Sequence, residues 1–341
     1  FTGVRRHMKG DVKAPGTEAV NAKRLVGFVR ALPIGRCFLR THDGHLLIRA
    51  GKTRFRMPTL MHIAGALDPA RAPACPSDEP IEIEAPTMGT LLNMGRVAMG
   101  TDPNRPHTYG VKFECTGEMA TVIATDGLCG VIVDAPSETE KAAFVLTPTS
   151  IAVVTAAIKQ AGDDAKTDDA EAYENHPPSV CVNASMDATH IHVGDTEVYA
   201  KAFVDHAKFA PLRRIMEMAI PKQRTTVRRE DLTSMVNSCC VAGDAGKSTM
   251  VALRFSEGKL SARAFSKVDR TQAAAECSSD YVGSDFEIGM NASFLYDSCR
   301  AFKDGELWLD HCEDPEKPLY LVGGEFDNVE AKFVMMPMRI G

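Results

Sequence analysis

The apolar and polar positions of this chain follow a helical period in some stretches and a strand period in others. Apolar residues recur every three or four positions in five segments, which predicts amphipathic helices there. We expect these helices over residues 22–32, 87–99, 148–161, 229–241 and 292–302. The intervening stretches hold short alternating or continuous apolar runs bounded by glycine and aspartate turns, a pattern typical of antiparallel strands.

The order of these predicted elements repeats along the chain. Residues 28–60 run from a helix end through two strands to Phe55 and Met57, and residues 299–338 follow the same order to Phe333 and Met336. A weaker copy lies between residues 158 and 199. Such self-similarity predicts repeated domains.

We therefore predict an α+β protein of three domains, each with helices packed on antiparallel sheets. The predicted boundaries are 1–78, 79–222 and 223–341. The first copy shows only the second half of the repeated order, so the first domain is expected to lack its N-terminal half. Residues 61–78, rich in alanine, proline and aspartate, are predicted to be a linker, and the acidic stretch 163–175 an exposed loop.

Composition narrows the functional class. The chain has 341 residues, 44% hydrophobic and 25% charged, an ordinary globular composition. It holds no apolar run of the roughly 18 residues that a membrane span requires, so we expect no membrane partner. The ten cysteines are scattered without a CxxC pair, which indicates reduced thiols in the cytoplasm and no metal or redox cofactor.

The C-terminal segment is unusual because chain ends are usually polar and tolerant of change. Residues 333–341 are rich in large apolar side chains, and Pro337 interrupts them. They form either a last strand that completes a sheet or a surface that holds an apolar partner. Pro337 cannot donate a ladder hydrogen bond, which favours a position near a sheet edge.

Four motifs carry a family resemblance. Residues 51–55, 123–127, 286–291 and above all 334–340 (Val-Met-Met-Pro-Met-Arg-Ile) resemble the bacterial DNA polymerase III β subunit, the beta sliding clamp family. This resemblance spans essentially the whole chain. It implies the DNA-clamp fold, in which three domains of one topology pair head to tail with a second copy to form a ring around duplex DNA. It also implies a non-catalytic processivity factor that tethers the replicative polymerase to its template.

The family also implies a pocket between the second and third domains for peptides of the polymerase, the clamp loader and other partners. These peptides carry glutamine and a Leu-Phe-type apolar pair. By position, the pocket residues are Thr125, Gly127, Leu128, Cys129, Arg214, Ile215, Val334, Met335, Met336, Pro337, Met338, Arg339 and Ile340. Methionines suit a groove that accepts several partners, because the flexible thioether repacks easily.

Two further sets of residues follow from this resemblance. The basic residues on or beside the predicted helices are Lys23, Arg24, Arg30, Arg96, Lys159, Arg228, Arg229, Arg300 and Lys303. With acidic residues concentrated in loops, they predict a positive inner wall inside a protein of net charge −6, contacting phosphates rather than bases. The contact between copies is expected at Lys52, Arg54, Phe55 and Met57 of one copy and Cys240 and Val241 of the other.

The chain departs from the family pattern at three places, one of which is the N-terminal half that the first domain is expected to lack. Leu128-Cys129 stands where the family usually has a His-Arg pair, so the polar part of the pocket differs. The stretch 269–276 is nearly neutral where the family has an acidic strand, so the ring contact cannot depend on the same charge pairs with Lys52 and Arg54.

Other functions have weaker support. Residues 243–249 end like a phosphate-binding loop, but position 241 is valine rather than the required glycine. His190 and His192 share a strand face without a third metal ligand nearby, which favours exposed histidines. The sequence shows no nucleophile paired with a base, so an enzyme has little support. The rival hypothesis is a clamp-fold interaction protein, such as a viral or plasmid-borne relative or a monomeric decoy, that binds the same peptides without forming a ring.

Overall fold

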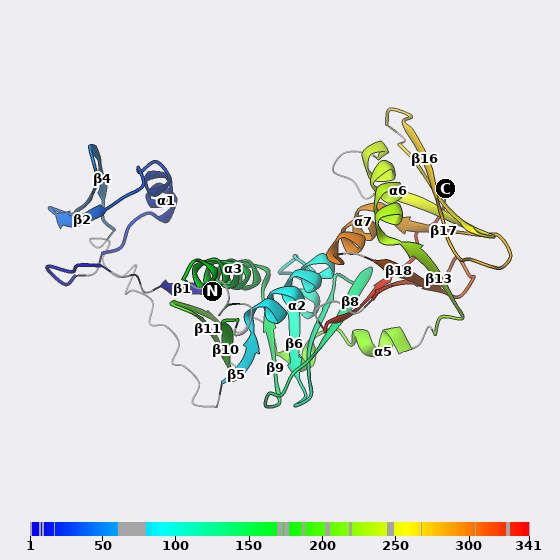
Figure 1. The fold of residues 1–341 in the computed structure, drawn as a ribbon, viewed down its shortest axis with the longest axis horizontal. Coiled ribbons are helices and arrows are strands. Elements are labelled where there is room, and N and C mark those ends of the chain that lie inside the picture. Colours follow the sequence, from blue (N-terminus) through cyan, green and yellow to red (C-terminus); the bar gives the residue numbers. More distant parts are fainter. Residues whose placement is uncertain are drawn as a thin grey trace. The chain divides into compact units, whose positions relative to one another are not determined.

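The computed structural model describes residues 2–6, 8, 10–16, 18–60, 80–168, 173, 177–185, 188–201, 205–217, 220–243, 249–266, 268–303, 305–324 and 328–340. The chain divides into two compact units. The large unit contains residues 1–7 and 75–341, and the small unit contains residues 8–74 (Figure 1). The predicted linker 61–78 lies outside the described residues.

The small unit is one helix on a three-stranded antiparallel sheet. Helix α1 (Ala22–Arg30) begins after Asn21, whose side chain accepts a hydrogen bond from the Arg24 amide at 3.0 Å, as predicted for an N-cap. The sheet order is β2 (Cys37–His42), β3 (His45–Ala50) and β4 (Thr53–Pro58). Phe28 of α1 stacks on Phe55 of β4 with ring centroids 4.4 Å apart.

The large unit contains three antiparallel sheets. The first has the order β1 (Thr2–Arg6), β12 (Thr196–Lys201), β11 (Ala188–Val193), β10 (Ser179–Ala184) and β5 (Ile81–Glu84). The strands that flank the small unit in sequence, β1 and β5, are therefore the two edges of one sheet. Ion pairs from Arg5 to Glu197 and from Arg6 to Asp164, each at 3.0 Å, bind β1 to the large unit.

The second sheet has eight strands and joins the second and third predicted repeats. Its order is β13 (Gln223–Arg228), β18 (Glu306–His311), β19 (Leu319–Gly323), β20 (Glu330–Met335), β8 (Cys129–Pro136), β7 (Met119–Thr125), β6 (Val111–Cys115) and β9 (Ala142–Leu146). Strands β20 and β8 pair from Glu330 opposite Asp134 to Met335 opposite Cys129. The last strand of the chain is thus an interior strand of this sheet.

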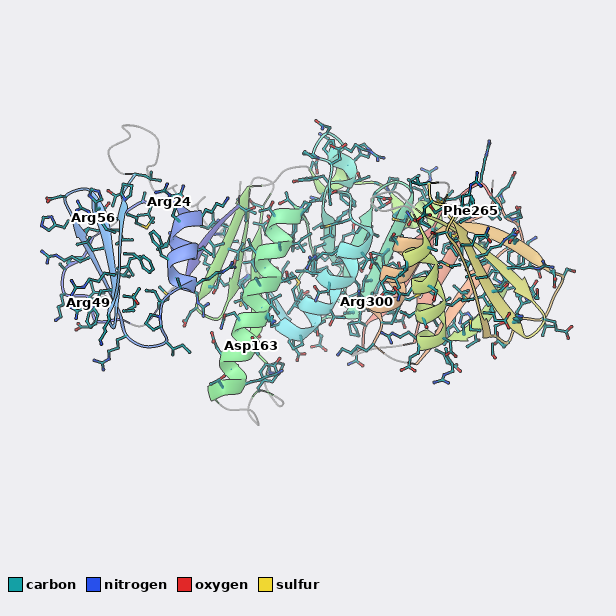
Figure 2. All side chains as sticks on the ribbon, turned by 90° about the horizontal axis from the view of Figure 1, so that it is seen from above. Arg24, Arg49, Arg56, Asp163, Phe265 and Arg300 are labelled. Carbon is teal, nitrogen blue, oxygen red and sulfur yellow. The ribbon has the colours of Figure 1, made fainter. Side chains whose placement is uncertain are left out.

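The third sheet has the order β16 (Gln272–Ser278), β15 (Lys259–Phe265), β14 (Met250–Ser256) and β17 (Phe286–Asn291). Its edge strand β16 has no strand partner on its outer side within the described part of the chain. Helices α2 (Ala85–Ala98), α3 (Pro148–Asp168), α6 (Arg229–Ala242) and α7 (Ala292–Ala301) cover one side of the three sheets (Figure 1). They follow one another in the order α3, α2, α7, α6 across the large unit (Figure 2).

The five predicted helices are present, and the predicted strands correspond to observed ones. Helix α3 continues to Asp168, so the prediction of a loop from residue 163 is wrong. Asp164 of this extension is held by the Gln160 amide at 2.8 Å and by Arg6, which explains why an acidic stretch stays helical. Residues 169–172 and 174–176 lie outside the described residues. The short helix α5 (Leu212–Glu217), the strand β9 and two 3-10 turns, Pro106–Thr108 and His206–Lys208, were not predicted.

Within the described residues, none of the helices has the length and apolar character needed to cross a lipid bilayer.

A buried histidine lies in an aromatic cluster of the third repeat. The His311 ring is 4.7 Å from the Phe255 ring and 4.9 Å from the Phe286 ring, and its Nε2 atom lies 3.0 Å from the Thr225 hydroxyl. Burial lowers the pKa of His311 below its ordinary value of 6.5, although nearby Glu313 and Asp310 oppose this shift. The folded protein therefore favours the neutral ring.

The lowered pKa of His311 predicts that the folded protein loses stability as the pH falls. The unfolded chain binds the His311 proton first, so this stabilisation is present above pH 6.5 and is lost as the pH falls toward the folded pKa. Urea unfolding between about pH 8 and about pH 5 should show a smaller decrease in stability for His311→Phe than for the wild type. Equal pH dependence in the two proteins would contradict this role of His311.

Candidate functional site

The turn between β7 and β8 is fixed by its own side chains. The Thr125 hydroxyl donates to the Cys129 carbonyl at 2.6 Å and accepts from the Gly127 amide at 3.0 Å. One Asp126 oxygen accepts from the amides of Leu128 at 2.8 Å and Cys129 at 2.9 Å. Gly127 has φ of +95°, a conformation that favours glycine. The turn therefore presents Leu128 to solvent, with 71% of the residue exposed.

Cys129 forms a neutral part of this surface. Its thiol donates to an Asp126 oxygen at 3.2 Å. Burial, and then the Asp126 charge, raise the pKa of this thiol far above its ordinary value. A thiol with this pKa stays protonated and is a poor nucleophile. Cys129 therefore contributes packing surface rather than reactivity.

The C-terminal residues extend from this turn to the third sheet. After β20 ends at Met335, the Met336 amide donates to the Leu128 carbonyl at 2.9 Å, and the Met338 amide donates to the Gly289 carbonyl of β17 at 2.8 Å. Pro337, between them, has no amide hydrogen. We call residues 336–340 the C-terminal strap. Met336 is 44% exposed and Ile340 is 38% exposed, so the strap presents apolar surface.

Helix α5 forms the second wall of this surface, on the side of the eight-stranded sheet opposite α2 and α7 (Figure 1). A Cβ atom at Gly130 of β8 would lie 2.7 Å from the Leu212 side chain, so α5 packs tightly on this strand. The Tyr320 hydroxyl of β19 donates to the Met216 carbonyl at 3.2 Å. Beneath α5 lies a small apolar cluster: Ile123, Ile132, Val145, Phe209, Leu212, Tyr320 and Val334.

Arg213 ties α5 to the outer face of the sheet. Its guanidinium donates to the Thr121 hydroxyl at 3.1 Å and lies 3.4 Å from Asp134 and 4.0 Å from Glu114. These partners come from three neighbouring strands, so the helix orientation is set by both the apolar cluster and this polar network. The next residues, Arg214 and Ile215, are exposed.

These contacts bring the predicted pocket residues together from three parts of the chain. The exposed surface consists of Leu128, Ile215, Met336 and Ile340, with Cys129, Pro337 and Met338 partly exposed. Three predicted pocket residues are instead buried: Thr125, Val334 and Met335. Thr125 holds the turn, Val334 lies in the small cluster beneath α5 and Met335 packs in the main core, so their assignment to the pocket stays a prediction. We call the exposed residues the apolar groove.

Sequence reasoning missed Arg105. A Cβ atom at Gly127 would lie 2.7 Å from the Arg105 Nη2 atom, so this guanidinium lies on the turn at the groove. The loop at 101–105 has no apolar periodicity that would mark it. The loop leads into the 3-10 turn Pro106–Thr108. The His107 carbonyl of this turn accepts a hydrogen bond from the Ala210 amide at 2.9 Å, which places the turn beside the segment leading into α5.

The chain resembles known proteins over almost its whole length. A family model described as DNA polymerase III beta subunit, C-terminal domain, matches residues 218–339. The beta sliding clamp of Pseudomonas aeruginosa is 22% identical over 342 residues, covering 99% of this chain and 86% of the relative. That of Caulobacter vibrioides is 25% identical over 346 residues, covering 96% of this chain and 84% of the relative.

Solved structures show the same fold. The DNA polymerase III beta subunit of Thermotoga maritima superposes with a TM-score of 0.82 at 18% identity, covering 100% of this chain and 86% of that chain. The chain has the fold of the DNA polymerase III beta subunit and is similar in sequence to that family. A second solved structure is a C. crescentus beta sliding clamp with PEG bound to a proposed beta-motif tethering region. It superposes with a TM-score of 0.78 at 23% identity, covering 99% of this chain and 86% of that chain.

The residues that the beta subunit family would direct toward DNA are mostly exposed. Arg96, Lys159, Arg228, Arg300 and Lys303 are exposed on or beside the helices of the large unit, and Lys23, Arg24 and Arg30 on α1 of the small unit. Arg24 and Arg300 are labelled in Figure 2. Arg229 differs, because its Nε atom donates to the Phe302 carbonyl at 2.8 Å and ties α6 to the end of α7.

Acidic residues also lie on these helices. Glu230 and Asp231 occupy the first turn of α6, and Asp163, Asp164 and Asp168 belong to α3. The acidic residues are therefore not confined to loops. Glu230 and Asp231 suit the first turn of α6 because its unpaired amides favour negative charge.

The residues expected at a family-type contact between copies differ in exposure. Lys52 and Arg54 are exposed, and Val241 is 79% exposed at the end of α6. Met57 is only 1% exposed because it lies in the core of the small unit, so its assignment to the contact stays a prediction. Phe55 and Cys240 are half-buried.

The sequence also held a histidine pair, His190 and His192, and a loop-like motif at residues 243–249, neither of which was assigned a function. His190 is 1% exposed, so the expectation of an exposed histidine is wrong for it, whereas His192 is exposed. Within the described residues, no three His, Cys, Asp or Glu residues could hold a metal ion together. Residues 244–248 of the loop-like motif lie outside the described part of the chain.

Two adjacent methionines test the division between core and groove. Met335→Ala should lower the free energy of unfolding by about 2–5 kcal/mol, because Met335 is buried. Met336→Ala should change it by less than about 0.5 kcal/mol, because Met336 is largely a surface residue. Urea denaturation of both variants measures the difference, and comparable losses would contradict the assignment.

Proposed function

We propose that this protein is a DNA sliding clamp. Two copies form a ring around duplex DNA, and the ring tethers the replicative polymerase and other peptide-bearing proteins without performing catalysis itself. The observation that carries the proposal is the agreement of the whole chain with a solved DNA polymerase III beta subunit at a TM-score of 0.82. The apolar groove at the junction of the second and third repeats adds a docking site for partners.

The groove suits a short peptide with neighbouring apolar anchors. Leu128, Ile215 and Met336 offer exposed apolar surface on three separate elements, so a Leu-Phe pair can be contacted from several sides. Leu128-Cys129 supplies no formal charge, because the Cys129 thiol stays protonated. We therefore expect these two residues to contact apolar anchors, and the Arg105 guanidinium to supply any cationic contact at this turn.

The ring contact would use open sheet edges. Strand β16 lies at the edge of the third sheet, and β4 lies at the edge of the small unit's sheet. Exposed edges favour pairing with another chain. Near β16, Val241, Phe265 and Val268 are 79%, 51% and 72% exposed, and Figure 2 labels Phe265. An apolar contact at these residues would replace the acidic strand that the family uses.

The helix side of the large unit would face DNA. Arg96, Lys159, Arg228, Arg300 and Lys303 supply positive charge there, and Lys23, Arg24 and Arg30 of α1 supply it on the small unit, taken by itself. Long flexible side chains on helices contact phosphates without reading bases. Because Glu230, Asp231 and Asp163 share this side, its attraction for DNA should be weak, which suits a ring that slides.

The proposed ring predicts that the protein is a dimer, and that substitutions at the proposed contact between copies separate it into monomers. Sedimentation of the wild type at tens of micromolar should give twice the 36.9 kDa chain mass. The double variant Val241→Asp with Phe265→Asp should be monomeric, because each buried apolar side chain of this size contributes roughly 1.5–3 kcal/mol. Val282→Asp, at a residue that is 72% exposed but outside this contact, is the matched control and should remain dimeric. A monomeric wild type would contradict the ring.

The groove predicts peptide binding that depends on Met336. A synthetic peptide containing glutamine and an adjacent Leu-Phe pair should bind with micromolar affinity, about −8 kcal/mol, because it buries little area and loses conformational freedom. Met336→Lys should abolish the heat of binding in calorimetry while the protein stays folded. Met8→Lys, at an exposed methionine of the small unit, should bind normally. Undiminished affinity in Met336→Lys would place the docking site elsewhere.

A further inference from the structure

We propose that the C-terminal strap packs directly on Gly289. Because Gly289 has no side chain, the strap can lie close to β17 and hold the residues of the apolar groove in place. This inference rests on the proposed peptide-binding function and assigns a positioning role to a residue outside the groove. Gly289 lies within β17, on the third sheet, whereas the groove lies at the end of the eight-stranded sheet. The strap is the segment that connects the two.

The backbone conformation does not explain a glycine at position 289. Gly289 is absent from the residues with positive φ, and it pairs regularly with Ala252 of β14. Alanine could adopt such a strand conformation, and glycine within a strand lowers its stability. A glycine in this context often marks a place where another backbone approaches closely.

The approaching backbone is the strap. A Cβ atom at Gly289 would overlap the Met338 carbonyl oxygen and would lie 3.2 Å from the Ile340 Cγ1 atom. The overlap with Met338 involves backbone, so a side-chain rotation cannot relieve it. The strap can therefore occupy this position only while residue 289 has no side chain.

Two backbone hydrogen bonds hold the strap, one on each side of Pro337. The Met336 amide donates to Leu128 at the groove, and the Met338 amide donates to Gly289. Pro337 fixes one of the few backbone torsions between these two hydrogen bonds, so the segment has less freedom to absorb a displacement at Met338 before it reaches Met336. Loss of the contact between Met338 and Gly289 should therefore move the exposed Met336 side chain that the peptide contacts.

The test compares Gly289→Ala with removal of the strap. Calorimetry with the Gln- and Leu-Phe-containing peptide should show about tenfold weaker binding for Gly289→Ala, the size of effect expected from one lost hydrogen bond and its positioning. A chain truncated after Met336 should also bind more weakly. Adding Gly289→Ala to the truncated chain should produce no further loss, because Met338 and Ile340, the strap residues that a side chain at position 289 would displace, are already absent.

Gly323→Ala is the matched control. Gly323 lies in β19 of the same repeat, and a Cβ atom there would overlap the Phe302 ring. This variant should lower stability without changing peptide affinity. Hydrogen exchange supplies a readout that general destabilisation would not reproduce: the Met338 amide should lose protection in Gly289→Ala and keep it in Gly323→Ala.

Three results would overturn the proposal. Gly289→Ala could bind the peptide like the wild type, or could weaken binding equally in the truncated chain, which would place its effect within the sheet. The Met338 amide could also stay protected in Gly289→Ala. If the wild type itself binds no peptide, the proposed groove fails and the positioning role fails with it, whereas any of the other results leaves the groove intact.

Discussion

The pairing of β8 with β20 is the interaction on which the rest of the structure depends. It joins segments about two hundred residues apart in sequence, and places Cys129 opposite Met335. Because of this register, the β7–β8 turn adjoins the strap, and Leu212 of α5 packs where Gly130 leaves room. Such a pairing has a high loop-closure cost, so the apolar packing of Val334 and Met335 must offset it.

In the proposed clamp, the two sides of the large unit would perform different tasks. On the helix side, regular packing leaves charged side chains exposed, yet Arg229 is used to tie α6 to α7 and does not remain available for a ligand. On the opposite side, the apolar cluster beneath α5 and the Arg213 network hold a short helix that could not be stable alone. A ring that slides on one side and binds partners on the other requires this separation.

The sequence predicted the long elements because their periodicity extends over many residues, as in α2, where Met88, Leu91 and Leu92 are buried. It missed α5 because six residues with only Leu212 buried give no periodic signal. The family motif pointed to the β7–β8 turn and the C-terminal segment as a pocket, but apolar character alone could not separate buried Met335 from exposed Met336. Gly289 carries no signal in one sequence, because its role depends on a backbone forty-nine residues away in the chain.

In the proposed function, the protein encircles DNA. The direct measurement is retention on a circular duplex onto which the protein has been concentrated, followed by gel filtration in high salt. A closed ring predicts that the protein stays with the circle in salt that removes it from linear DNA, because phosphate contacts alone are salt-sensitive. Cutting the circle once should then release it. Equal salt sensitivity on circular and linear DNA, or retention after cutting, would contradict the account.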